Sequence, residues 1–270
     1  MKKVFIKISV LSIALAIATS CKKGDTGPGG ATGPAGPSLT GNTQGVVNLY
    51  DVGGAKQLSA TLQAGDSLIL TNSSTNAVLK TVTSATGAFA FNNLSTGTYN
   101  MTVSKPGYGK VVTQGIQILG GGNTDRNFSL SVIPSTNVTS TAISDTALVN
   151  GAGGTPENYV HIRGFVPVST SETTVIIFVS VLGGSSASSA VGNYSTTYTT
   201  TIAPGVTKFT VNIPISNLYD LGFATGNMVS FAEYIIGGTT SASSYVDWTT
   251  GQTVYTALSS TPVNTAIAIW

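Results

Sequence analysis

Cysteine, histidine and charged side chains are all scarce in this sequence. The 270 residues include one cysteine and one histidine, and only 8% of them are charged. A lone cysteine cannot form a disulfide within the chain, so we expect apolar burial to hold the folded part together. Zinc sites are built from several Cys and His ligands, which this chain lacks. The sequence therefore predicts no cofactor, although a calcium site made of Asp and carbonyl oxygens stays open.

The few titratable residues also argue against catalysis. His161, the single histidine, lies between Val160 and Ile162 in an apparent strand, which is typical of a structural histidine. No Gly-x-Ser-x-Gly motif accompanies it, so the sequence does not indicate a serine hydrolase. We predict that the protein is not an enzyme.

The charge balance excludes strongly charged partners. The formal net charge is +2, and loss of a leader containing Lys2, Lys3 and Lys7 leaves nine basic and ten acidic side chains. Nucleic-acid-binding proteins carry a basic patch that a near-neutral chain does not supply. We therefore predict no nucleic-acid partner.

The N-terminal apolar segment is too short to be a membrane-spanning helix. Residues 8–17 form an apolar run of about ten residues after three lysines, whereas a spanning helix needs about 20. The run ends in Ala-Thr-Ser followed by Cys21, which resembles the lipobox of Bacteroidetes-type bacterial lipoproteins, with Ala18 where that motif usually has Leu. The resemblance implies that residues 1–20 are a signal peptide and that Cys21 takes the lipid that anchors the protein to the outer membrane. An ordinary signal peptide with an incidental cysteine is the alternative.

Residues 21–40 have the composition of a spacer. Glycine occurs at every third position from Gly24 to Gly36, with prolines between, which gives a collagen-like run of five triplets from Gly24 to Ser38. A collagen triple helix would require a trimer. We expect instead a disordered stalk rich in polyproline II conformation that carries a monomeric head.

From about Gly41 the sequence alternates between apolar and polar residues in short runs separated by turn residues, and no sustained helical period is present. Alternation is clear at residues 88–91 and 99–103, which predicts strands with one buried face. The strand candidates are 46–50, 67–71, 78–83, 88–91, 98–104, 126–131, 138–143, 160–165, 174–182, 194–202, 207–213, 228–236, 245–250 and 253–258. The pattern predicts an all-β fold of two tandem β-sandwich domains, residues 41–134 and 135–270.

Two family resemblances fit this division. Residues 86–94 (TGAFAFNNL), 97–104 (GTYNMTVS) and 107–108 (GY) resemble the carboxypeptidase regulatory-like domain, with Thr86 where the family often has Asp or Asn. The resemblance covers roughly residues 41–134 and implies a transthyretin-like sandwich related to carbohydrate-binding folds, without a catalytic group. Residues 205–234 resemble the later strands of fibronectin type III domains, which implies an immunoglobulin-like sandwich for 135–270.

Aromatic residues in the second region are the remaining functional candidates. Sugars stack on exposed aromatic faces, so we select Trp248, Tyr245 and Tyr234 as glycan contacts; the alternative is that these side chains are core residues. Two functions stay open. One is a non-catalytic structural or interaction module of the cell envelope, in contact with surface proteins. The other is a carbohydrate-binding surface lipoprotein that captures polysaccharide for a partner enzyme or transporter, on the periplasmic or extracellular face.

The lipid anchor gives the first testable prediction. Because Cys21 is the only cysteine, Cys21→Ser should abolish lipid attachment and leave an unprocessed or soluble chain. Labelled palmitate fed to cells should enter the wild-type protein and not the variant. Equal incorporation into both proteins would contradict the prediction.

Overall fold

The computed structural model describes residues 39–149, 156–181, 194–238 and 244–269. The predicted signal peptide, Cys21 and the spacer up to residue 38 lie outside these ranges. The described residues belong to one compact unit from Leu39 onward. Among them, no helix is long and apolar enough to span a membrane.

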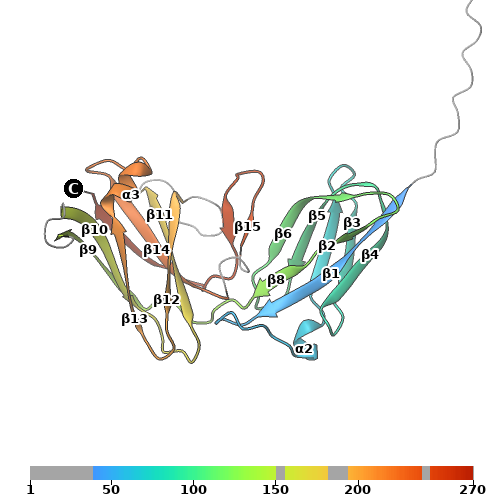
Figure 1. Ribbon diagram of the computed structural model, residues 1–270, viewed down its shortest axis with the longest axis horizontal. Helices are drawn as coiled ribbons and strands as arrows, with labels where there is room; N and C mark the ends of the chain where they lie inside the picture. The colour runs from blue at the N-terminus through green and yellow to red at the C-terminus, as the bar shows by residue number, and fades with distance from the viewer. Residues whose placement is uncertain (1–38, 150–155, 182–193, 239–243, 270) are drawn as a thin grey trace, which may run out of the picture. The chain divides into compact units, whose positions relative to one another are not determined.

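Two four-stranded sheets form the first sandwich, whose strands run from blue to green in Figure 1. One sheet has the order β4-β1-β7, with β8 also paired to β1, and the other has the order β3-β2-β5-β6. The elements are β1 (Thr40–Tyr50), α2 (Ala60–Gln63), β2 (Ser67–Asn72), β3 (Val78–Val82), β4 (Ala88–Ser95), β5 (Gly97–Ser104), β6 (Val111–Ile118), β7 (Asn123–Asp125) and β8 (Phe128–Ser131).

The core of the first sandwich follows from strand alternation. Phe89 and Phe91 are both 6% exposed and belong to one cluster, with ring centroids 6.4 Å apart in an edge-to-face arrangement. On β5, Tyr99, Met101 and Val103 face the same core. Successive side chains of a strand point to opposite faces, so these residues reach the core from every second position. The predicted register of both strands is confirmed.

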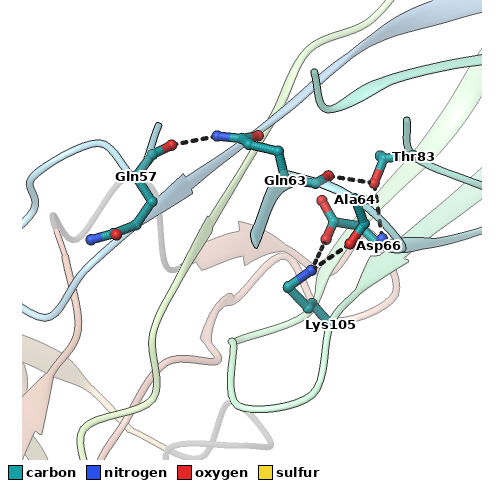
Figure 2. Close-up of polar contacts among 6 residues, drawn as sticks. All are labelled: Gln57, Gln63, Ala64, Asp66, Thr83 and Lys105. Carbon is teal, nitrogen blue, oxygen red and sulfur yellow. Dashed lines mark hydrogen bonds and ion pairs between the residues drawn. The ribbon is translucent and has the colours of Figure 1, made fainter. Parts of the chain in front are cut away.

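A buried ion pair joins the ends of two neighbouring strands in this sandwich. Asp66 precedes β2 and Lys105 follows β5, and their charged groups lie 2.6 Å apart. Figure 2 shows the Lys105 ammonium also donating to the Ala64 carbonyl oxygen, at 2.9 Å. Thr83 Oγ1 accepts from the Asp66 backbone N–H at 2.9 Å and donates to the Gln63 carbonyl oxygen at 2.8 Å.

These bonds fix the chain between α2 and β2. The side-chain amide of Gln63 donates to the Gln57 carbonyl oxygen, which ties α2 to the preceding segment. In the described part of the chain, the second Asp66 oxygen and Gln63 Oε1 are buried without a partner. A buried charge left without its counter-ion is strongly destabilising, so the pair is a structural element of the sandwich.

The second sandwich also contains two sheets, of order β13-β10-β9 and β12-β11-β14-β17, and the hairpin β15-β16 accompanies them. A six-residue helix, α3, follows β13. The elements are β9 (Ser140–Val149), β10 (Pro156–Phe165), β11 (Thr173–Val181), β12 (Thr196–Ile202), β13 (Lys208–Pro214), α3 (Ile215–Asp220), β14 (Met228–Ile236), β15 (Ser244–Val246), β16 (Thr253–Tyr255) and β17 (Val263–Ala268). The predicted all-β class and tandem sandwich arrangement are confirmed.

The central strand β11 is buried on both faces. Val175, Ile177 and Val179 belong to the core between the two sheets. Ile176 and Phe178 belong to a separate cluster on the opposite face. All five side chains have no exposed surface. This explains why the strand reads as a continuous apolar run instead of an alternating one.

Glu233 is a carboxyl group buried in the second core. It lies on β14 between Phe231 and Ile235, which both belong to the inter-sheet cluster, and it has no exposed surface. Thr265 on β17 donates a hydrogen bond of 2.9 Å to Oε1. Burial raises the pKa of the Glu233 carboxyl to about 7, and the hydrogen bond from Thr265 only partly opposes this rise.

Three local differences from the predicted strands have physical causes. The alternating pattern does not predict β6, because a bulge at Gly115, with φ of +70°, shifts its pairing with β5. The pattern also does not predict β17, where Asn264 and Thr265 interrupt the apolar sequence. The strand predicted at 245–250 ends at Val246, because Asp247 Oδ1 accepts the Thr249 N–H and begins a turn.

Truncation of a core ring tests the first sandwich. Phe91→Ala should lower the free energy of unfolding by about 3–5 kcal/mol, because it removes a large buried side chain and leaves a cavity. Urea denaturation measures this loss. Phe165→Ala is a suitable control, since Phe165 is 43% exposed and should cost far less. A loss below about 1 kcal/mol for Phe91→Ala would show that the strand register is wrong.

The buried carboxyl predicts a pH dependence of stability. The unfolded chain releases the Glu233 proton near the ordinary pKa of 4.5, whereas the folded chain holds it to about 7. Between these values the unfolded state binds fewer protons, so the free energy of unfolding should fall as the pH rises. The contribution is fully present below pH 4.5 and is lost by about pH 7, a decrease of about 3 kcal/mol.

Denaturation curves between pH 4 and pH 8 measure this decrease. The fall in the free energy of unfolding with pH should disappear in Glu233→Gln. It should persist in the control Glu172→Gln, because Glu172 is an exposed carboxyl. Identical slopes for wild type and Glu233→Gln would contradict the assignment.

Candidate functional site

Four aromatic rings pack together on the outer face of the sheet β12-β11-β14-β17. Phe178 on β11 is at the centre, with ring centroids 5.1 Å from Tyr194, 5.7 Å from Tyr234 and 5.5 Å from Tyr255. All three contacts are edge-to-face, the geometry that the quadrupoles of aromatic rings favour. Tyr194 also donates a hydrogen bond of 2.7 Å to the Thr253 carbonyl oxygen, which ties it to β16. The cluster thus gives the rings fixed positions.

A hollow of about 640 Å³, the tyrosine groove, lies beside this cluster. Four tyrosines contribute to its wall: Tyr108, Tyr234, Tyr245 and Tyr255. Its other lining residues are mostly small hydroxyl or apolar side chains, together with one cation: Thr256, Ser259, Ser260, Ile133, Val254, Leu258 and Lys110. The groove therefore combines aromatic surface with many hydroxyl groups.

A tight turn in the first sandwich positions Tyr108. The Tyr108 N–H donates to the Lys105 carbonyl oxygen at 3.1 Å, and Gly107 between them has φ of +80°. Proline at the second turn position and glycine with positive φ at the third are the signature of a type II turn, which residues 105–108 have. The turn begins at Lys105, whose ammonium is held in the buried ion pair. Tyr108 is thus linked to a rigid part of the sandwich.

The hydroxyl groups of Tyr108 and Tyr245 stay protonated at neutral pH. Burial raises the pKa of Tyr108, and the charges of Asp66 and Asp51 add to the rise. Burial likewise raises the pKa of Tyr245, and the charge of Asp247 adds to it. Within the described ranges, neither hydroxyl group has a hydrogen bond to the protein. Each can therefore donate a hydrogen bond to a ligand.

Trp248 is exposed at the tip of the hairpin β15-β16. Its side chain is 65% exposed, and its backbone N–H donates to Gln114 Oε1 at 3.0 Å. A Cβ atom at Gly115 would lie only 2.2 Å from a carbon of the Trp248 ring, so the ring rests directly on this glycine. A second hollow of about 300 Å³, the tryptophan groove, is lined by Trp248, Tyr245 and residues of β6.

The three predicted glycan contacts lie in this area, but they differ in accessibility. Trp248 is exposed, Tyr245 is half-buried, and Tyr234 is only 7% exposed within the aromatic cluster. Their contact with glycan stays a prediction. Sequence reasoning did not select Tyr108 and Lys110, since both lie far from the second region along the chain. No local pattern could have found them, because only the folded contacts bring them to the groove.

The remaining titratable groups of the described residues form no recognisable catalytic arrangement. His161 is 4% exposed, and its Nδ1 lies 2.7 Å from Asn212 Oδ1 on the adjacent strand, as expected for a structural histidine. Within residues 39–149, 156–181, 194–238 and 244–269, no group of three or more His, Cys, Asp or Glu side chains could hold a metal ion.

Several solved structures are distantly similar to the chain. A "putative carbohydrate binding protein" from Bacteroides uniformis is 12% identical, with a TM-score of 0.28, and the match covers 84% of this chain and 98% of that one. A DUF3823 family protein from Parabacteroides merdae is 15% identical, with a TM-score of 0.25 and coverage of 82% and 98%. The major pilin subunit of Bacillus cereus is 12% identical, with a TM-score of 0.25 and coverage of 85% and 68%. These values are too low to carry an argument about function.

The family comparison is more specific. No curated protein matches the chain. The family model of the carboxypeptidase regulatory-like domain matches residues 58–131, inside the region where the sequence motifs indicate that family. No catalytic family is identified, and the matched strands form the first sandwich. Residues 58–131 are therefore similar to the carboxypeptidase regulatory-like domain.

Proposed function

We propose that this protein is a non-catalytic lipoprotein of the cell envelope that binds neutral polysaccharide in the tyrosine groove. The observation that carries the proposal is the hollow of about 640 Å³ with four tyrosines in its wall. Small-molecule sites in proteins typically measure about 300–1,000 Å³ and combine apolar walls with a few directed polar groups. The tyrosine groove has both properties.

The chemistry of the groove suits a sugar ring. A pyranose presents a flat face of C–H groups, which packs on aromatic rings, and a rim of hydroxyl groups, which need hydrogen-bond partners. Tyr255 and Tyr245 offer ring surface, and the protonated hydroxyls of Tyr108 and Tyr245 offer donors. Buried polar groups of a ligand must be satisfied in this way for binding to be favourable.

The charges favour a neutral ligand over an ionic one. Lys110 is the single charged side chain in the described lining of the groove. Asp51 and Asp247 lie close enough to act on the tyrosine hydroxyls, so negative charge offsets this cation. A strongly anionic or cationic polymer would meet no surface of opposite sign.

The anchor sets where the groove would act. Lipid on Cys21 would hold the protein at the outer membrane, and the spacer of residues 21–40 would separate the groove from the lipid headgroups. Polysaccharide captured there would be concentrated near a partner enzyme or transporter. A binding protein without catalytic groups gains its value from this rise in local concentration.

A structural or interaction role is the second candidate, and one observation favours it. The strand β3 lies at the edge of its sheet, and Val78 and Val82 on it are 52% and 62% exposed. An exposed apolar edge strand can pair with a strand of another protein. Lys80 between these valines disfavours uncontrolled pairing, so the tyrosine groove is the stronger basis for a function.

Substitution of Tyr245, which lines the tyrosine groove, tests the proposal. On a glycan array, the full chain carrying Cys21→Ser should bind one or more neutral polysaccharides. Tyr245→Ala in that background should weaken binding by about 2 kcal/mol, the cost typical of a central aromatic contact. The control is Tyr219→Ala, because Tyr219 is 42% exposed on α3 and does not line the groove. Absence of binding to every neutral glycan would refute the proposal and favour the interaction role.

A further inference from the structure

The tyrosine groove and the tryptophan groove meet at one residue. Tyr245 lines both hollows, whereas Tyr108 and Tyr255 line only the first and Trp248 lines only the second. Trp248 therefore lies outside the lining of the tyrosine groove. Two hollows with separate aromatic surfaces and a shared wall form a track with room for more than one ring.

We propose that the site binds at least two consecutive sugar units of an extended neutral chain, the first against Tyr108 and Tyr255 and the next on Trp248. This inference rests on the proposed function and specifies its ligand as an oligosaccharide instead of a monosaccharide. Tyr245 lies between the two units and contacts both. The protein thereby binds the polysaccharide in preference to the free sugars that are released when the polysaccharide is degraded.

Trp248 is held in place before any ligand arrives. Its backbone N–H donates to Gln114 Oε1 at 3.0 Å, and the turn that carries it is closed by a 2.7 Å bond from the Gly251 N–H to the Asp247 carbonyl oxygen. One face of the ring is supported by Gly115. Even so, 65% of the side chain is exposed. An aromatic ring that is both exposed and immobilised loses little entropy on binding, which is the property of a stacking platform.

The first sandwich supplies part of each subsite. The tyrosine groove takes Tyr108 and Lys110 from the segment before β6, and the tryptophan groove takes Val111–Gln114 from β6 itself. The hairpin β15-β16 contributes Tyr245 and the neighbouring turn contributes Trp248. The carboxypeptidase regulatory-like domain is therefore a direct participant in binding, and not only a spacer between the anchor and the second sandwich.

The test is a ligand-length series. Isothermal titration of the full Cys21→Ser chain would use cello-, malto-, xylo- and manno-oligosaccharides of one to six units. In a series that binds, the affinity should rise by about tenfold or more between one unit and three, the scale expected for one added aromatic contact, and then level off. Decaproline serves as the probe for an extended peptide in the same grooves.

Two substitutions of Trp248 test whether the rise in affinity with ligand length depends on its ring. Trp248→Ala should remove the gain with length. Trp248→Phe should keep part of the gain, because a smaller ring remains. Tyr219→Ala is again the control and should behave as wild type. Melting temperatures close to the wild-type value show that each variant is folded, as expected for a side chain that is 65% exposed.

The outcomes separate this inference from the proposed function. Monosaccharides that bind as tightly as hexasaccharides, with binding still lost in Tyr245→Ala, would overturn the inference and keep the function. A gain with length that persists in Trp248→Ala would also overturn it. Absence of binding at every length, or tight binding of decaproline alone, would overturn both.

Discussion

The central strands β11 and β14 of the sheet β12-β11-β14-β17 are buried on both faces, and much of the second sandwich depends on this constraint. One face packs against the opposing sheet, and the other carries Ile176, Phe178 and Ile236, which would be exposed to water without a cover. Each fully buried side chain of this size contributes about 1.5–3 kcal/mol. With no disulfide possible in a chain that has one cysteine, the cover must come from packing alone. Tyr255 and Leu258 provide it from β16 and the segment after it.

The tyrosine groove is a consequence of this cover. Tyr255 packs edge-to-face on Phe178, and the same residue contributes to the groove wall. Tyrosine suits both roles because its ring fills apolar space while its hydroxyl reaches the solvent side. The packing that stabilises the sheet thereby positions the groups available to a ligand. In the first sandwich, the buried ion pair of Asp66 and Lys105 holds the first residue of the turn that ends at Tyr108, and so helps to position this tyrosine.

The sequence predicts the strands well where alternation is simple. Phe89 and Phe91 are two residues apart and share a core, as their spacing indicates. The pattern fails at β6, because the Gly115 bulge breaks the period, and a bulge is specified by its pairing with Asn100 across the sheet. The residues that line the two grooves are harder to predict from the sequence. Trp248 and Tyr245 could be selected by residue type, whereas Lys110 has no local feature that distinguishes it from any exposed lysine.

The contact of Trp248 with Gly115 constrains how these sandwiches can change over time. Glycine is needed at position 115 for two reasons. The backbone there has a φ of +70°, and no Cβ atom would fit beneath the indole ring. A replacement there displaces a side chain 133 positions away along the chain. Tandem domains are often exchanged between proteins by recombination as self-sufficient modules. Here a transplanted second sandwich would keep its strands but would lose the support of its tryptophan, so the placement of that ring depends on both sandwiches.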